Sequence, residues 1–210
     1  MSAVRPRLLV ATFNPGKARE LARLVAPLGI EVLSLADLGI REPYEETAGS
    51  YEENALGKAQ HYAALARLPT LADDSGLEID ALGGRPGPLS ARYGTAGLDD
   101  AGRNRLLLHE IEGVPDDRRT ARYVAVAALA RPARDPAVRL FRAVCEGRIS
   151  REPHGQNGFG YDPIFFYPPF DATFGEIDNA RKDQVSHRGK AMSQVTSFLA
   201  TPEGRTFLEL

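Results

Sequence analysis

The chain has 210 residues, of which 43% are hydrophobic and 26% are charged, a composition typical of an ordinary globular protein. Its 26 Lys and Arg residues nearly balance 28 Asp and Glu residues, so the sequence lacks the basic excess expected of a nucleic-acid or membrane-surface binder. The single cysteine, Cys145, excludes an intrachain disulfide and a cysteine-rich zinc site. Because no apolar run resembles a secretory signal or a membrane span, we expect a cytoplasmic protein that binds neither nucleic acid nor membrane.

A strand followed by a capped helix is predicted near the start of the chain. Residues 8–11 form a compact apolar run, and Asn14 and Pro15 suit the N-cap and the first position of a helix. The helix is amphipathic, with apolar residues at Leu21, Leu24, Val25 and Leu28. A polar loop with Lys17 at a helix N-terminus is suited to gather phosphate oxygens on backbone N–H groups. An ordinary strand–helix loop is the alternative, because the P-loop spacing is absent.

An acidic loop and a second helix follow a second predicted strand at residues 31–35. Glu45 and Glu46 lie in the loop, and the Ser50-x-x-Glu53 pattern predicts a capping box that opens a helix running to about residue 67. Asn54 and Lys58 lie one turn apart on one side of that helix. These two side chains belong either to a solvated polar face or to a functional cleft, and the sequence does not decide between the two.

The central stretch, residues 71–77, reads Leu-Ala-Asp-Asp-Ser-Gly-Leu, with two adjacent carboxylates after a short apolar run. We expect Asp73 and Asp74 at the end of a buried strand, on a turn made possible by Gly76. Neighbouring side chains on an extended backbone point to opposite sides, so one carboxylate would face a cleft while the other braces the turn. Taken alone, an ordinary surface turn explains these residues equally well.

The second half of the chain predicts a helix, a strand pair, a glycine turn and a terminal helix. Residues 99–111 read as the helix, and residues 123–130 and 138–145 read as the paired strands. Two glycines flank Phe159, which would offer either a core aromatic or a stacking surface for a base. The basic segment from Ser186 to Lys190 precedes the terminal helix. With no repeat, linker or domain boundary evident, we expect one domain over residues 1–210 with an α/β fold built on a mixed sheet.

Together these features predict a nucleoside triphosphate site. The carboxylates of Glu45, Glu46, Asp73 and Asp74 are suited to a hard divalent cation, most simply Mg²⁺. The cations that would offset phosphate charge are Lys17, Lys58, Lys182 and Arg188. Because the sequence shows no pattern of a covalent nucleophile, the chemistry that remains is metal-assisted attack of water on a phosphoryl centre.

The chain resembles the inosine triphosphate pyrophosphatase family, in its bacterial XTP/dITP diphosphatase form. The resemblance extends from residue 8 to about residue 199 and rests on six motifs in the family's order. These are Thr12-x-Asn14-x-x-Lys17, Glu45-Glu46-Thr47, Glu53-Asn54-Ala55 with Lys58, Asp73-Asp74-Ser75-Gly76-Leu77, Pro86-Gly87 with Ser90-Ala91-Arg92-Tyr93, and Gly158 to Phe165 with Lys182 and Ser186-His187-Arg188. Each motif alone is weak to moderate, but six in register are highly specific.

The resemblance implies a role for each matching residue. Asp74 would be the general base and a Mg²⁺ ligand, with Glu45 as the other metal-binding carboxylate. The substrate-binding residues would be Thr12, Phe13, Asn14, Pro15, Gly16 and Lys17 at the triphosphate, Ser75, and Phe159, Gly160, Tyr161, Asp162, Lys182, His187 and Arg188 at the nucleoside. Two local departures stand out: Phe13 is bulkier than the family's usual residue, and Ala48 replaces a frequent glycine.

The resemblance also implies the reaction and the architecture. The family hydrolyses non-standard purine nucleoside triphosphates (ITP, dITP and XTP) to the monophosphate and pyrophosphate, and so cleanses the nucleotide pool. It folds as an elongated mixed β-sheet with flanking helices and two lobes around a central nucleotide cleft, and it usually forms a homodimer. Two alternatives stay open at this point: a nucleotide sensor, which would not need the Glu45 and Asp74 carboxylates, and a related pyrophosphatase for pyrimidine or methylated nucleotides.

Overall fold

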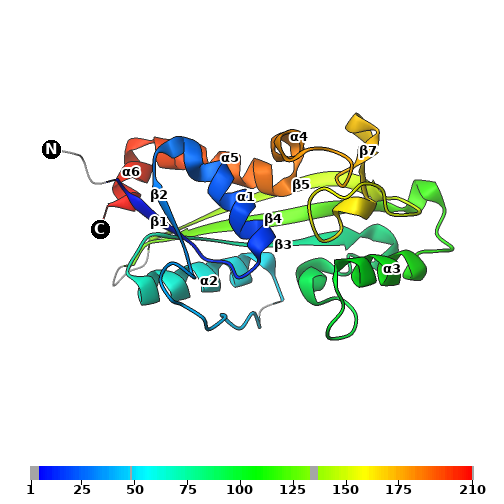
Figure 1. The fold of residues 1–210 in the computed structure, drawn as a ribbon, viewed down its shortest axis with the longest axis horizontal. Coiled ribbons are helices and arrows are strands. Elements are labelled where there is room, and N and C mark those ends of the chain that lie inside the picture. The colour runs from blue at the N-terminus through cyan, green and yellow to red at the C-terminus, as the bar shows by residue number, and fades with distance from the viewer. Residues whose placement is uncertain (1–4, 48, 133–136, 210) are drawn as a thin grey trace. The chain divides into compact units, whose positions relative to one another are not determined.

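The computed structural model describes residues 5–47, 49–132 and 137–209, so the departure at Ala48 lies outside the described residues. One mixed sheet of seven strands, in the order β2-β1-β3-β4-β5-β6-β7, carries flanking helices, which confirms the predicted α/β class (Figure 1). The strands are β1 (Arg7–Val10), β2 (Glu31–Ser34), β3 (Thr70–Ile79), β4 (Thr120–Ala130), β5 (Val138–Ile149), β6 (Phe165–Tyr167) and β7 (Ala172–Thr173).

The sheet combines parallel and antiparallel pairs. β1 pairs in parallel with β2, with Leu8 opposite Val32, and in parallel with β3, with Leu9 opposite Thr70. β6 pairs antiparallel with both β5 and β7. Because β1 has a strand on each side, its apolar run is fully buried, as expected for a central parallel strand.

The helices begin where the capping residues predict. Asn14 caps α1 (Pro15–Val25), with Pro15 in the first turn, and Ser50 caps α2 (Tyr51–Ala66) by accepting a hydrogen bond from Glu53 N. The other helices are α3 (Asp100–Glu110), α4 (Asn179–Val185), α5 (His187–Ala200) and α6 (Pro202–Leu208). Short 3₁₀ helices span Ala26–Leu28, Asp80–Leu82, Gly87–Arg92, Asp116–Arg118, Asp162–Ile164 and Pro168–Phe170. The predicted helix after the basic segment is confirmed as α5, which has 14 residues, but it is not terminal, because the short helix α6 follows it.

The predicted turn at Gly76 is also wrong. β3 continues through Asp73, Asp74 and Ser75 to Ile79, and nearly every residue of the strand is buried. β1 pairs with β3 only at Thr70 and Leu71, so β4 is the neighbouring strand for the rest of β3. This long-range pairing outweighs the local turn preference of an Asp-Ser-Gly sequence. The two carboxylates thus lie in the middle of a rigid strand, not on a loop.

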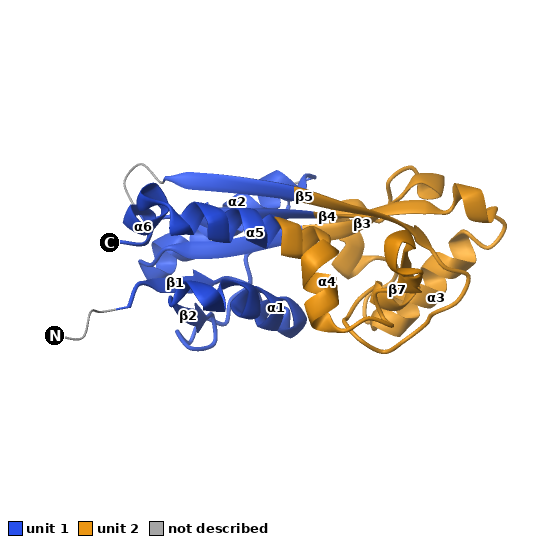
Figure 2. Ribbon diagram, turned by 90° about the horizontal axis from the view of Figure 1, so that it is seen from above, with its two compact units in different colours: residues 1–74, 125–142, 191–210 blue, residues 75–124, 143–190 orange. Residues whose placement is uncertain are grey.

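The chain divides into two compact units, coloured separately in Figure 2. Unit 1 comprises residues 1–74, 125–142 and 191–210, and unit 2 comprises residues 75–124 and 143–190. β3, β4 and β5 contribute residues to both units, and the single domain over residues 1–210 stays a prediction. Over the described ranges, none of the helices is long and apolar enough to cross a membrane.

Candidate active site

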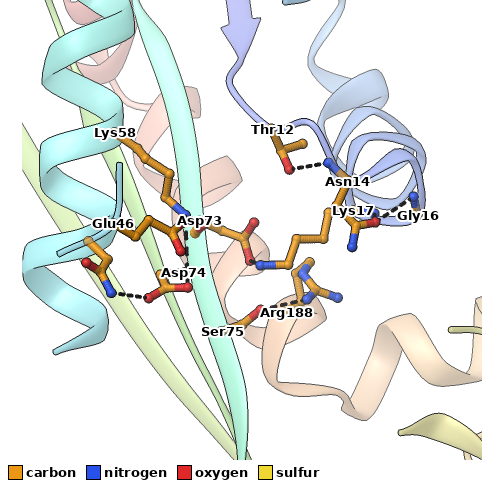
Figure 3. A network of polar contacts seen from close by, with 11 residues as sticks. Thr12, Asn14, Gly16, Lys17, Glu46, Lys58, Asp73, Asp74, Ser75 and Arg188 are labelled. Atoms are coloured by element: carbon orange, nitrogen blue, oxygen red, sulfur yellow. Dashed lines mark hydrogen bonds and ion pairs between the residues drawn. The ribbon is translucent and has the colours of Figure 1, made fainter. Parts of the chain in front are cut away.

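Two adjacent carboxylates on β3 contact two different helices of unit 1 (Figure 3). Asp73 Oδ2 lies 3.3 Å from Lys17 Nζ on α1, whereas Asp74 Oδ2 accepts a hydrogen bond of 3.0 Å from Asn54 Nδ2 on α2. Both carboxylates are almost fully buried, at 2% and 4% exposure. This arrangement confirms that the two side chains point to opposite sides of the strand, as an extended backbone requires.

Lys58 joins the acidic loop to β3. Its ammonium group forms an ion pair with Glu46, donates a hydrogen bond of 2.7 Å to the backbone oxygen of Asp73, and lies 3.9 Å from Asp74 Oδ1. The sequence left open whether Asn54 and Lys58 were surface residues. Their one-turn spacing was the available signal, and the structure places both on the carboxylate cluster.

Burial raises the pKa of Asp74 above that of an ordinary aspartic acid. Desolvation is the largest cause, and the nearby ammonium groups of Lys58 and Lys17 and the Asn54 hydrogen bond offset it only in part. A carboxylate with a raised pKa is a stronger base, so Asp74 is suited to take a proton from water near neutral pH.

The N-terminus of α1 is organised by two short polar side chains. Thr12 Oγ1 accepts a hydrogen bond from Asn14 N, and Asn14 Oδ1 accepts from the N–H groups of Gly16 and Lys17, at 3.1, 2.8 and 3.1 Å respectively. This network orders the segment from which Lys17 reaches Asp73. The bulky Phe13 does not disturb the cap, because its ring is half-exposed and lies edge-on to Tyr62 at 6.5 Å.

The carboxylates can provide only part of a metal coordination shell. No group of three or more His, Cys, Asp or Glu side chains in the described part of the chain is arranged to hold a metal ion. However, the Lys58 ammonium contacts carboxylate oxygens of Glu46 and Asp74 and the backbone oxygen of Asp73. This convergence of oxygens creates an environment that favours positive charge. Mg²⁺ typically takes one or two carboxylates and completes its shell with phosphate oxygens and water, so these donors fit it.

Of the two adjacent glutamates, Glu46 is the one that contacts Lys58 in the carboxylate cluster. Glu46 is partly buried and paired with Lys58, whereas the side chain of Glu45 is exposed. The assignment of Glu45 as a metal ligand stays a prediction.

In unit 2, the buried carboxylate of Asp162 organises the glycine turn. Asp162 Oδ2 accepts hydrogen bonds from Lys182 Nζ at 2.6 Å and Phe159 N at 2.8 Å, and Tyr123 Oη donates to Oδ1 at 3.4 Å. Gly158 has a φ of +75°, and a Cβ atom there would overlap the Asp162 carboxylate. The glycine is therefore required both by its backbone conformation and by the close approach of Asp162.

The Phe159 ring lies beside two cationic side chains. Lys182 Nζ and the Arg188 guanidinium carbon are 5.1 and 5.4 Å from its centroid, within the range of cation–π contacts. Arg188 also donates a hydrogen bond of 2.8 Å to Ser75 Oγ. His187 stacks on Tyr123, with ring centroids 4.4 Å apart and planes within 10°. An aromatic ring and several donors are thus held together in unit 2.

The remaining residues of the glycine turn are anchored inward. Gly160 N donates to Asp100 Oδ2 at 2.7 Å, and Asn104 Nδ2 donates to Gly160 O at 3.1 Å. Tyr161 is buried, and its hydroxyl donates to Ser90 O at 2.8 Å. Substrate contacts from Gly160, Tyr161 and Asp162 stay predictions, and the side chains of Tyr161 and Asp162 are already engaged in the interior.

The Ham1 family model matches residues 8–198 of this sequence. The chain belongs to the Ham1 family. It is 43% identical over 188 residues to a Haemophilus ducreyi protein named dITP/XTP pyrophosphatase, a match that covers 90% of this chain and 95% of the relative. A Vibrio parahaemolyticus protein of the same name is 45% identical over 194 residues, or 92% and 96% of the two chains.

Solved structures agree with this membership of the Ham1 family. A HAM1 protein from Coxiella burnetii is 40% identical, with a TM-score of 0.83 over 92% of this chain and 98% of that one. A structure from Mycobacterium abscessus, described as a nucleoside-triphosphatase and dITP/XTP pyrophosphatase, is 44% identical, with a TM-score of 0.69 over 90% and 98%. The family expected from the sequence motifs is therefore confirmed.

Proposed function

We propose that this Ham1-family chain is a nucleoside triphosphate pyrophosphatase that converts ITP, dITP and XTP to the monophosphate and pyrophosphate, and so cleanses the nucleotide pool. The observation that carries the proposal is the buried Asp74 carboxylate with a raised pKa, held by Asn54 and Lys58. The names of the relatives from Haemophilus ducreyi and Vibrio parahaemolyticus support the substrate class.

The unit 1 residues would bind the triphosphate and activate water. Lys17 and Lys58 supply positive charge, and the Thr12–Gly16 segment forms the start of α1 at which phosphate oxygens can bind. Asp74, with a neighbouring glutamate, would hold Mg²⁺, and the contacts described above favour Glu46 over Glu45. When bound, Mg²⁺ neutralises phosphate oxygens and so lowers the barrier to nucleophilic attack.

In the reaction itself, a carboxylate oxygen of Asp74 accepts a proton from the attacking water. The water oxygen bonds to the α-phosphorus, the anhydride bond between the α- and β-phosphates breaks, and the electron pair of that bond leaves with pyrophosphate. Lys17 and Lys58 offset the charge that develops on the phosphate oxygens. Lys58 contacts both Glu46 and Asp74. Its positive charge reduces the repulsion between the two carboxylates, so that they can lie close together.

The unit 2 residues would bind the base. Phe159 offers a stacking surface beside the donors of Lys182 and Arg188, and His187, stacked on Tyr123, offers a further donor. Hypoxanthine and xanthine present an acceptor at C6 and a donor at N1, whereas adenine presents the reverse. A pocket built for the first pattern leaves groups unpaired with ATP, at a cost of about 1–3 kcal/mol for each unpaired group. Guanine differs from hypoxanthine only by its 2-amino group, so a donor directed at C2 would oppose GTP and favour XTP.

A substrate panel with separate detection of pyrophosphate and orthophosphate tests the proposal. We expect ITP, dITP and XTP to be hydrolysed with far higher kcat/KM than GTP and ATP, with pyrophosphate as the product and no turnover in EDTA. Equal rates with GTP and ITP, or release of orthophosphate, would refute the specificity. Binding of ITP without any turnover in Mg²⁺ would identify a sensor instead of an enzyme.

We also infer a homodimer, on family resemblance, and a cytoplasmic location, on the sequence. A monomeric mass by light scattering at micromolar concentration would overturn the dimer.

A further inference from the structure

One face of α2 contacts the carboxylate cluster and the acidic segment at residues 42–46. Its positions follow the i, i+3, i+4, i+7, i+8 pattern of one helix face: Asn54, Gly57, Lys58, His61 and Tyr62. Asn54 and Lys58 hold the carboxylates. The proposed chemistry of unit 1 gives no role to the other three, although each of them contacts the segment at residues 42–46 or a residue that does.

The Tyr62 hydroxyl is bonded to two backbone groups of this segment. It accepts a hydrogen bond of 2.7 Å from Tyr44 N and donates one of 3.0 Å to Glu42 O. Residues 41–47 form neither helix nor strand, so contacts of this kind are what gives the segment a defined position. Tyr62 itself is a rigid anchor, because its side chain is 1% exposed within the core of unit 1.

The Tyr44 ring packs against the same face of the helix. A Cβ atom at position 57 would lie 2.8 Å from Tyr44 Cζ and closer still to the hydroxyl oxygen, so a side chain there would displace the ring. His61 contacts Tyr44 with ring centroids 5.5 Å apart, and it contacts Tyr62 edge-on at 4.8 Å. The backbone and the ring of Tyr44 are therefore both held in place, and Glu46 follows only two residues later in the chain.

We propose that Tyr62 is a positioning residue that, together with the close approach of Tyr44 to Gly57, fixes the segment at residues 42–46 so that Glu46 faces Lys58 and Asp74. This inference rests on the proposed function, because it concerns the carboxylate pair assigned to Mg²⁺. Outer contacts of this kind orient the ligand carboxylate and so raise the affinity for the metal without touching it.

Tyr62→Phe tests the proposal because it keeps the ring and removes only the hydroxyl. We expect the Tyr44 amide proton to exchange about tenfold faster, since it loses its acceptor. We expect the half-saturating Mg²⁺ concentration for ITP hydrolysis to rise about tenfold, while the KM for ITP at saturating Mg²⁺ changes little. A lower Tm with unchanged exchange and unchanged Mg²⁺ dependence would overturn the proposal, because a purely structural role gives that result.

A second pair of variants keeps the test independent of Tyr62. Gly57→Ala displaces the Tyr44 ring and should reproduce the rise in the half-saturating Mg²⁺ concentration for ITP hydrolysis. The double variant Gly57→Ala/Tyr44→Ala removes the clash and keeps the backbone N–H that Tyr62 binds, but it also loses the ring packing. It should therefore recover part of the Mg²⁺ affinity and match Tyr44→Ala alone. A double variant no better than Gly57→Ala alone would count against the mechanism.

The control and the exchange measurement separate this proposal from the proposed function. Tyr167→Phe deletes a phenol hydroxyl in unit 2 and should alter neither Mg²⁺ dependence nor the exchange of Tyr44. Absence of ITP hydrolysis by the wild-type protein would refute the proposed function. The exchange rate of the Tyr44 amide proton would still report on its hydrogen bond with Tyr62 in that case. Normal hydrolysis with unaltered exchange in Tyr62→Phe would refute the positioning role alone.

Discussion

Replacing Asp74 by asparagine separates the proposed catalytic role of this carboxylate from its structural role. The amide keeps an oxygen that can accept the hydrogen bond from Asn54 Nδ2, so the change removes a charge and a basic site and little else. General acid–base catalysis contributes about 10²- to 10⁴-fold. At about 1.36 kcal/mol per tenfold, the activation free energy should rise by about 2.7–5.4 kcal/mol.

The same substitution should stabilise the metal-free protein at neutral pH. Burial raises the pKa of Asp74 in the folded state above its value in the unfolded chain, so the folded state disfavours the ionised form. Between these two pKa values the folded state binds more protons, and the free energy of unfolding falls as pH rises. Asparagine cannot ionise, so the variant avoids that loss at pH 7, and the two proteins should converge at a pH below the unfolded-state pKa.

Two measurements check this reasoning. Steady-state pyrophosphate release should give the predicted loss in kcat, and thermal unfolding in EDTA should give a Tm for Asp74→Asn equal to or above that of the wild type at pH 7. Asp73→Asn is the matched control, because it breaks the ion pair with Lys17 and should lower Tm. A folded Asp74→Asn protein with near-wild-type kcat would refute its role as the base, and a large fall in Tm would refute the argument from burial.

Three further predictions follow from the cluster. Lys17→Ala should chiefly raise the KM for ITP, because its proposed role is that of a point charge on the phosphates, and unchanged kcat and KM would place the phosphates elsewhere. Glu46→Gln should raise the half-saturating Mg²⁺ concentration more than Glu45→Gln does, and the reverse order in a Mg²⁺ titration would restore Glu45 as the ligand. Lys58→Met should move the acid limb of the kcat/KM profile to higher pH, because the Lys58 charge lowers the pKa of Asp74; an unmoved limb would contradict that coupling.

Local chemistry in the sequence was enough to predict most elements of the fold. The N-caps at Asn14 and Ser50 act over three residues, so the starts of α1 and α2 could be placed from the sequence. The apolar run at residues 8–11 has no periodicity of its own, yet its length and its flanking loop correctly indicated a buried strand. Each of these signals depends on neighbours in the chain, and each was confirmed.

Features set by contacts distant in the sequence could not be predicted. Gly76 lies within β3 because strand pairing in the sheet, with β4 as the neighbour, keeps the backbone extended. The residues around Gly76 carry no signal of that pairing. The difference between Glu45 and Glu46 has the same origin. The two residues have identical side chains, and only the contacts of the segment with α2, through Tyr62 and Lys58, distinguish the partly buried glutamate from the exposed one.

The charges of the unit 1 cluster favour binding of the triphosphate together with a divalent cation. When all are ionised, the carboxylates of Glu46, Asp73 and Asp74 outnumber the ammonium groups of Lys17 and Lys58 by one. One excess negative charge repels a triphosphate, and at low effective dielectric the repulsion acts strongly at close range. A divalent cation reverses the sign of the net charge and so converts repulsion into attraction. The same excess of carboxylate helps to keep Asp74 basic, because Glu46 raises its pKa. A third ammonium group in the cluster would improve affinity for the free nucleotide but would lower the pKa of the proposed base, so the observed balance favours catalysis over metal-free binding.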